Sequence, residues 1–137
     1  MPTKHGYVAI HNRTKESLLA PHVQVADSIL SRLIGLLGKR SLEPGSGVWI
    51  FPSNSAHTIG MLFAIDLILI DKGLQVVGLH ESVRPFSVTL PNFRAESMIE
   101  LPPHTILKSH TEIGDQLQIE RCEAEAAPRA TIRKVWK

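Results

Sequence analysis

Alternating apolar and polar positions along the chain predict a series of short strands. In residues 7–11 the side chains alternate between two faces, with Val8 and Ile10 on one and Tyr7, Ala9 and His11 on the other. Similar short stretches bounded by turn residues predict further strands at 22–26, 48–51, 65–71, 74–80, 97–101 and 116–121.

Two of these stretches carry more detailed expectations. Residues 65–71 are apolar at nearly every position, so we expect both faces of that strand to be buried. The following Asp71-Lys72-Gly73 predicts a tight hairpin turn in which Gly73 has a positive φ. Pro102-Pro103 should end the strand at 97–101 and open a single helical turn through Ile106 and Leu107.

The longest helical pattern covers residues 27–38. Asp27 is a suitable N-cap, and Gly38 suits the left-handed position that follows a helix. We expect this helix to pack Leu33 and its apolar neighbours on the sheet. The apolar stripe at helical spacing consists of Ile29, Leu30, Leu33, Ile34, Leu36 and Leu37.

In this chain of 137 residues, these elements predict an α+β domain, mostly antiparallel β, that forms a small barrel or half-barrel with one short N-terminal helix. We expect a single compact domain over residues 1–121 and a basic C-terminal tail over 122–137. Residues 1–120 hold ten basic and eleven acidic side chains, whereas residues 121–137 have a net charge of +3. Within the tail, we expect Trp136 to dock on the domain rather than to contact an anionic membrane.

Composition and charge exclude several classes of protein. Hydrophobic residues make up 43% of the chain, and no apolar run approaches the roughly 18 residues of a membrane-spanning helix. Cys122 is the single cysteine, so an internal disulfide is impossible. Because the basic charge belongs to the tail, we expect no nucleic-acid partner. No apolar leader follows Met1, and we therefore expect a cytoplasmic protein.

No established motif for metal, nucleotide or acyl-transfer chemistry is present. The seven histidines include no pair at the helical zinc spacing, and there is no Cys-x-x-Cys. The sequence also lacks Gly-x-Gly-x-x-Gly, a Walker motif and Gly-x-Ser-x-Gly. We therefore expect neither a metal site nor a cofactor.

Polar residues gather between the strands at 48–51 and 65–71, and two interpretations apply to them. In the first, His57 is a base oriented by Asp66, with Ser55 or Ser53 as the nucleophile. In the second, which we favour, the carboxylate and the small polar side chains accept backbone N–H bonds. A binding site here would consist of Ser53, Asn54, His57, Thr58 and Asp66, with Trp49 and Met61 as apolar walls.

Asp115, which follows Gly114, has the same two interpretations. A Gly-Asp pair at a turn normally places positive φ at the glycine and lets the carboxylate cap backbone amides. We favour that structural role over a catalytic one.

Seven segments occur in an order that resembles a known family. They are Arg32-Leu33-Ile34-Gly35-Leu36-Leu37, Val48-Trp49-Ile50, His57-Thr58-Ile59-Gly60-Met61, Ile65-Asp66-Leu67-Ile68-Leu69-Ile70-Asp71, Gln75-Val76-Val77, Glu100-Leu101-Pro102 and Gly114-Asp115-Gln116-Leu117. The set resembles the bacterial and archaeal family called domain of unknown function 192. The resemblance implies a compact, mostly β domain with a short helix and no established activity. Many similar proteins carry an export leader.

We therefore expect a ligand- or protein-binding module, whose partner is a small molecule or a protein. One alternative is a hydrolase-like enzyme that uses His57 and Asp66. Another is an accessory factor of envelope or pilus assembly, which only the leaders of similar proteins support.

Overall fold

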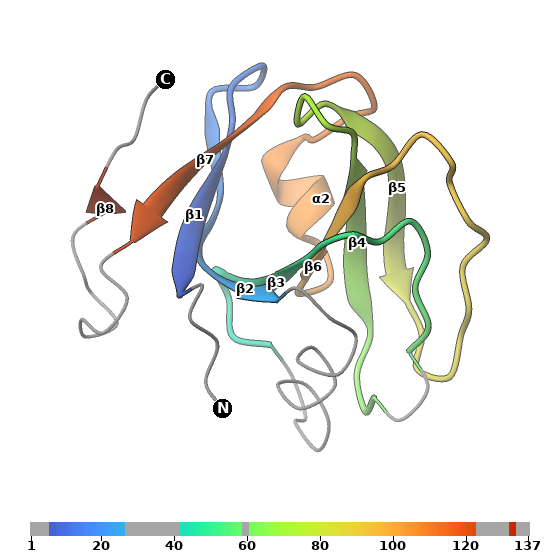
Figure 1. Ribbon diagram of the computed structural model, residues 1–137. Coiled ribbons are helices and arrows are strands. Elements are labelled where there is room, and N and C mark those ends of the chain that lie inside the picture. Colours follow the sequence, from blue (N-terminus) through green and yellow to red (C-terminus); the bar gives the residue numbers. More distant parts are fainter. Residues whose placement is uncertain (1–5, 27–41, 59–60, 123–131, 134–137) are drawn as a thin grey trace.

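The computed structural model describes residues 6–26, 42–58, 61–122 and 132–133. Within them, one sheet has eight strands in the order β5-β4-β6-β3-β2-β1-β7-β8 (Figure 1). The pair β2 and β3 is parallel, and the other pairs in this order are antiparallel. The elements are β1 (Tyr7–Asn12), β2 (Ser17–Ala26), β3 (Ser46–Ile50), β4 (Ile65–Ile70), β5 (Val76–Val83), β6 (Ser97–Leu101), α2 (Thr105–Ser109), β7 (Leu117–Cys122) and β8 (Ile132–Arg133).

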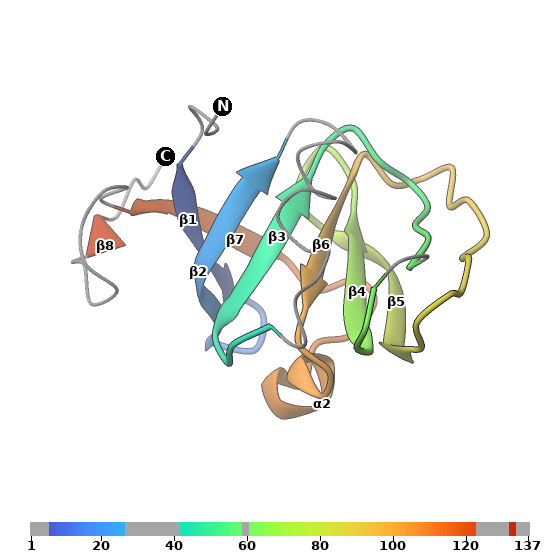
Figure 2. The same ribbon diagram turned by 90° about the horizontal axis from the view of Figure 1, so that it is seen from below.

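The sheet curls so that the residues directly before β5 and β7 lie side by side. Gln75 and Gln116 form an antiparallel bridge, and the Leu117 N–H donates to the Leu74 carbonyl at 2.9 Å. α2 lies at one end of the curled sheet (Figure 2). The prediction of a mostly antiparallel half-barrel is thus confirmed in outline.

Two apolar cores use opposite faces of the sheet. The concave core has members from six strands and α2: Val8, Ile10, Leu19, Ala20, Val23, Val25, Ile68, Ile70, Val76, Ile99, Leu101, Ile106 and Leu117. The outer core lies on the other face of β3, β6, β4 and β5: Ala26, Val48, Ile50, Ala56, Met61, Ile65, Leu67, Leu69, Val77 and Met98. All six residues of β4 are buried, which confirms the expected burial of both of its faces.

The predicted helical turn after the two prolines is present as α2. Ile106 is buried in the concave core, whereas Leu107 is exposed. The longer helix predicted at 27–38, with Leu33, lies outside the described residues. So do residues 123–131 and 134–137 of the predicted tail. The two residues of β8 pair with Arg121 and Cys122 of β7.

The hairpin between β4 and β5 corrects one expectation. Positive φ occurs at Leu74 (67°) and not at Gly73. Asp71 makes this turn possible, because its Oδ1 accepts the N–H groups of both Gly73 and Gln75 at 2.9 Å. The carboxylate holds the turn, so the left-handed conformation falls one residue later than the glycine.

Candidate functional site

The polar loop singled out from the sequence is one strand of a two-stranded ribbon outside the sheet. Residues 53–58 run antiparallel to residues 86–92, and His57 forms a bridge with Val88. We call this pair of segments the outer ribbon. Further backbone bonds within it join Thr58 to Ser87, Ala56 to Thr89 and Asn54 to Asn92.

The polar side chains of the outer ribbon mainly bond its own backbone. Buried Thr58 is the centre of this network: its Oγ1 donates to the Arg84 carbonyl at 2.6 Å and accepts from the Ser87 N–H at 2.8 Å. The Ser53 hydroxyl donates to the Ser55 carbonyl at 3.2 Å. Thr58 thus fastens the two segments together, whereas the bond of Ser53 to Ser55 stays within one of them.

Asp66 faces away from this fastening and organises the backbone elsewhere. Its side chain is fully buried; Oδ1 accepts from the Ser82 N–H at 2.8 Å and Oδ2 from the Ile106 N–H at 2.9 Å. Along β4 it alternates with Ile65 and Leu67, which belong to the outer core together with Ala56 and Met61. Both carboxylate oxygens thus bond backbone amides, on the face of β4 opposite to the one that contributes Ile65 and Leu67 to the outer core.

The two expected apolar walls belong to different parts of the interior. Met61 is fully buried in the outer core. Trp49 packs against the concave core, is tilted on Phe51 with ring centroids 5.1 Å apart, and donates from Nε1 to Ser97 Oγ at 3.0 Å. Their separation follows from strand alternation, which turns Trp49 away from the outer core that Val48 joins.

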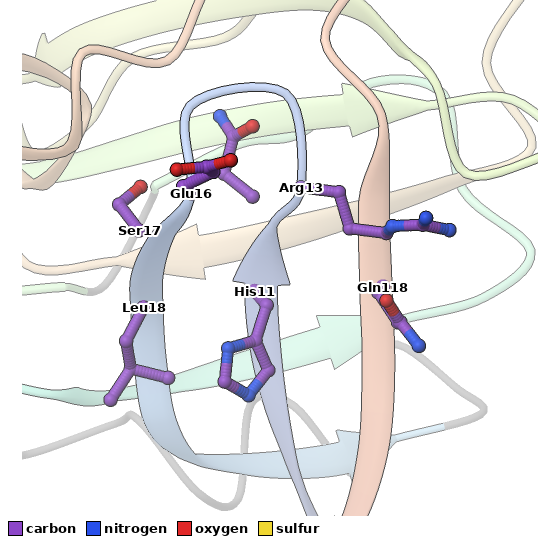
Figure 3. A pocket seen from close by; sticks show the side chains of 7 residues that line it. His11, Arg13, Glu16, Ser17, Leu18 and Gln118 are labelled. Atoms are coloured by element: carbon purple, nitrogen blue, oxygen red, sulfur yellow. The ribbon is translucent and has the colours of Figure 1, made fainter. Parts of the chain in front are cut away.

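A broad hollow of about 710 Å³ lies instead over β2, β1 and β7 (Figure 3). In this view the His11 ring occupies the middle, between Leu18 of β2 and Gln118 of β7. Arg13 and Glu16 come from the β1–β2 turn, and their side chains point to opposite sides. The lining residues are His11, Asn12, Arg13, Glu16, Ser17, Leu18 and Gln118.

A buried carboxylate holds His11 in this hollow. Nε2 of His11 lies 2.8 Å from Oε1 of Glu120, whose side chain is only 1% exposed, whereas that of His11 is 27% exposed. The other oxygen of Glu120 is buried and has no hydrogen-bond partner among the residues that the structure describes. Because a buried carboxylate is costly without partners, this pair fixes the orientation of the His11 ring.

A second polar network lies directly beyond the hollow, at the end of β1. Asp115 accepts from Asn12 Nδ2 at 2.9 Å, from Lys15 Nζ at 2.8 Å and from the Glu112 N–H at 2.9 Å. Burial alone would raise the pKa of Asp115, but the hydrogen bonds from Lys15, Asn12 and Glu112 and the charge of Lys15 lower it below its ordinary value. The structural interpretation of Asp115 agrees with this arrangement.

Sequence reasoning missed the pair of His11 and Glu120. The two residues are 109 positions apart, and no spacing rule joins them. The alternation of residues 7–11 did place His11 opposite Val8 and Ile10. Nothing in the pattern of β7 distinguishes Glu120 from an exposed polar residue between apolar ones.

Neither a metal cluster nor a membrane span is found in the part of the chain that the structure describes. No three His, Cys, Asp or Glu side chains gather there as metal ligands would. Over the same residues, no helix has the length and apolar character needed to cross a membrane.

The chain is similar to known proteins in sequence and in fold. UPF0127 protein PH1112 of Pyrococcus horikoshii is 30% identical over 114 residues, which cover 80% of this chain and 96% of that protein. Two crystal structures share the fold. One is a candidate transcription regulator from Sinorhizobium meliloti 1021, with a TM-score of 0.69 and 18% identity over 82% of this chain and 92% of that one.

The other structure is a protein of unknown function from Novosphingobium aromaticivorans. Its TM-score is 0.65 at 14% identity, and the match covers 82% of this chain and 83% of that one. The model of the family DUF192, described as "Uncharacterized ACR", matches residues 10–119. The chain therefore belongs to the DUF192 family of uncharacterised proteins.

Proposed function

We propose that the domain is a ligand-binding module and that the hollow over β1 is its binding site. The observation that carries this proposal is the imidazole of His11, held at the floor of the hollow by the buried Glu120 carboxylate. Ligand sites commonly combine an apolar wall with a few oriented polar groups. Leu18, which is 48% exposed, supplies the apolar wall here.

The charges around the hollow favour a small zwitterionic ligand. Glu120 is hydrogen-bonded to His11, and Arg13 and Glu16 lie on opposite sides of the hollow (Figure 3). Within the described residues, the side chains of Arg13 and Glu16 form no ion pair. A carboxylate near Arg13, an ammonium group near Glu16 and an apolar group on Leu18 would satisfy all three. An amino-acid-like molecule has this chemistry.

Two features support binding over the hydrolase-like alternative with His57 and Asp66. Both oxygens of Asp66 already bond backbone amides. The Ser53 hydroxyl, a suggested nucleophile, donates to the Ser55 carbonyl. A base needs an orienting partner and a nucleophile within hydrogen-bond reach, and these contacts use the named groups for other purposes.

The test is a titration of the ¹⁵N-labelled full chain, followed by NMR, with L-leucine as the probe. We expect chemical-shift changes centred on the amides of His11, Arg13, Leu18 and Gln118. N-acetyl-leucine and leucinamide, each lacking one charge, should bind at least about tenfold more weakly, because each loses a charge-assisted hydrogen bond. The proposal is wrong if all three compounds at millimolar concentration leave these amides unchanged.

A further inference from the structure

Exposed large apolar side chains concentrate on residues 86–93, which include one strand of the outer ribbon. Phe86, Val88, Leu90 and Phe93 are 68%, 72%, 84% and 87% exposed. In Figures 1 and 2 this segment projects beyond β5, at the opposite end of the sheet from β7 and β8. Scattered single apolar residues need no explanation, but a group of four on eight consecutive positions marks an interaction surface. We call these four side chains the apolar face.

The fold holds the apolar face outward. Ser87 and Thr89 alternate with the apolar residues and are half-buried. Both bond the other strand of the ribbon: the Ser87 backbone N–H donates to Thr58 Oγ1 at 2.8 Å, and Thr89 Oγ1 accepts from the Ala56 N–H at 2.9 Å. This is the reverse of the usual pattern, in which apolar side chains face the interior and polar ones face water. Hydrogen bonds to two buried residues, Thr58 and Ala56, therefore fix the exposure of the apolar face.

Two arginines stand at the ends of this segment. Arg84 and Arg94 are both exposed, and residues 82–95 include no Asp or Glu. The nearest acidic side chains along the chain are Glu81 and Glu96. Apolar groups flanked by cations complement a surface that is apolar below and anionic above, which describes a bilayer containing acidic phospholipids.

We propose that the apolar face, with Arg84 and Arg94, docks this domain on an anionic lipid surface. Its side chains would enter the boundary between headgroups and acyl chains while the arginines contact lipid phosphates. The inference does not depend on the ligand hollow, which lies over β2, β1 and β7.

The backbone around the apolar face favours lipid over a protein strand. Pro85 and Pro91 bracket residues 86–90 and have no N–H group. This edge therefore cannot donate backbone hydrogen bonds at either end to an added peptide strand. The backbone of residues 86–92 pairs with residues 53–58 on one side. A two-stranded ribbon leaves peptide groups unpaired on its outer edges, which limits how deep it can enter, because such groups are not tolerated in the hydrocarbon layer. Both constraints point to contact at the level of the headgroups.

The experiment is co-sedimentation of the full chain with vesicles of phosphatidylcholine, with and without phosphatidylserine. We expect binding to the phosphatidylserine vesicles that falls at least about tenfold in the double variant Phe86→Ser, Leu90→Ser. Arg84→Gln and Arg94→Gln should each lower binding about fivefold. Added salt should weaken the binding of the unmodified chain.

The matched control is the double variant Leu107→Ser, Ile113→Ser. These two side chains are 64% and 63% exposed but lie on α2 and the turn that follows, so their replacement should leave vesicle binding unchanged. Thermal melting without lipid checks that every variant is folded. Equal binding to vesicles without phosphatidylserine would overturn the role of the arginines.

Two other outcomes would overturn the proposal as a whole. If Phe86→Ser, Leu90→Ser still binds vesicles fully, the binding belongs to another part of the chain, such as the basic residues after 121. The unmodified chain could instead fail to bind vesicles and form a dimer in sedimentation velocity. If this variant abolishes that dimer, the apolar face joins two copies of the chain.

Discussion

His11 on β1 and Glu120 on β7 form a histidine–carboxylate pair across neighbouring strands, with Nε2 and Oε1 2.8 Å apart. In the register of these strands Glu120 is opposite Ala9, and His11 is opposite Gln118, so the bond runs diagonally between positions two residues apart. The small side chain of Ala9 leaves room for the carboxylate beside the imidazole. The pair thus gives one strand face both a fixed polar centre and a buried charge.

Replacing His11 should reveal the cost of that buried charge. We expect His11→Ala to lower the free energy of unfolding by about 1–3 kcal/mol, because Glu120 loses its hydrogen-bond donor. His11→Gln keeps a donor and should lose clearly less. Urea unfolding at neutral pH measures both. Equal losses in the two variants would mean that the hydrogen bond contributes nothing and that only ring packing matters.

The ion pair of Lys15 and Asp115 predicts a dependence of stability on pH. The hydrogen bond to Asp115 raises the pKa of Lys15, against a smaller opposing effect of desolvation, and the network lowers the pKa of Asp115 below 3.8. A lowered acid pKa stabilises the fold above the unfolded value, and this stability is lost as pH falls through the folded value. The raised pKa of Lys15 preserves its contribution up to at least pH 10.5.

We therefore expect Lys15→Met to destabilise the chain at pH 7 and to have a shrinking effect as pH falls below 3.8. Urea unfolding across that range is the measurement. Lys72→Met, at an exposed position in the β4–β5 turn, is the control and should show a difference that does not vary with pH. A constant effect of Lys15→Met down to pH 2 would contradict the assignment.

Asp66 and Asp71 offer a matched comparison between buried and exposed acceptors. Each carboxylate accepts two backbone N–H groups, but Asp66 is buried and bonds one amide of β5 and one of α2, whereas Asp71 bonds two amides of an exposed turn. Asp66→Ala should cost about 1–3 kcal/mol of stability, because water cannot easily replace the lost acceptor. Asp71→Ala should cost less, and similar losses would contradict the structural role of Asp66.

Gly47 marks a close approach between β3 and β6. A Cβ atom at this position would lie 2.5 Å from the Glu100 carbonyl oxygen and 2.8 Å from a methyl carbon of Leu101. We expect Gly47→Ala to destabilise by about 1–3 kcal/mol, because backbone must move to admit the methyl group. Gly73→Ala, whose nearest contact would be 3.6 Å, should be tolerated. Differential scanning calorimetry distinguishes the two.

The sequence predicts the fold best where the apolar pattern of a single strand determines its burial and its bounds. The apolar run of β4 indicated burial on both faces, and the strand at 97–101 was found with the predicted bounds. The hairpin turn was found too, but its positive φ moved to Leu74 because the Asp71 side chain determines the local hydrogen bonds. The pattern of apolar and polar residues alone does not show which residue of the turn has the positive φ.

The site was harder to predict because its members come from distant strands. The density of polar residues at 53–58 indicated chemistry, yet the Thr58 hydroxyl fastens this segment to Arg84 and the Ser53 hydroxyl bonds its own segment. The pairing of His11 with Glu120 depends on the register of β1 against β7, which only the folded sheet provides. The apolar residues at 86–93 alternate as in an ordinary strand, and only their surroundings show that they face outward.

The most direct test of the proposed function removes each charge of the ligand and each of the two charges of the hollow, singly and in combination. Binding of L-leucine, leucinamide and N-acetyl-leucine is measured by NMR titration for the unmodified chain, Arg13→Gln and Glu16→Gln, with Lys72→Gln as the control. The proposal predicts that Arg13→Gln binds leucine and leucinamide equally, and that Glu16→Gln binds leucine and N-acetyl-leucine equally. If both variants keep the preferences of the unmodified chain, these charges do not recognise the ligand and the proposed site is wrong.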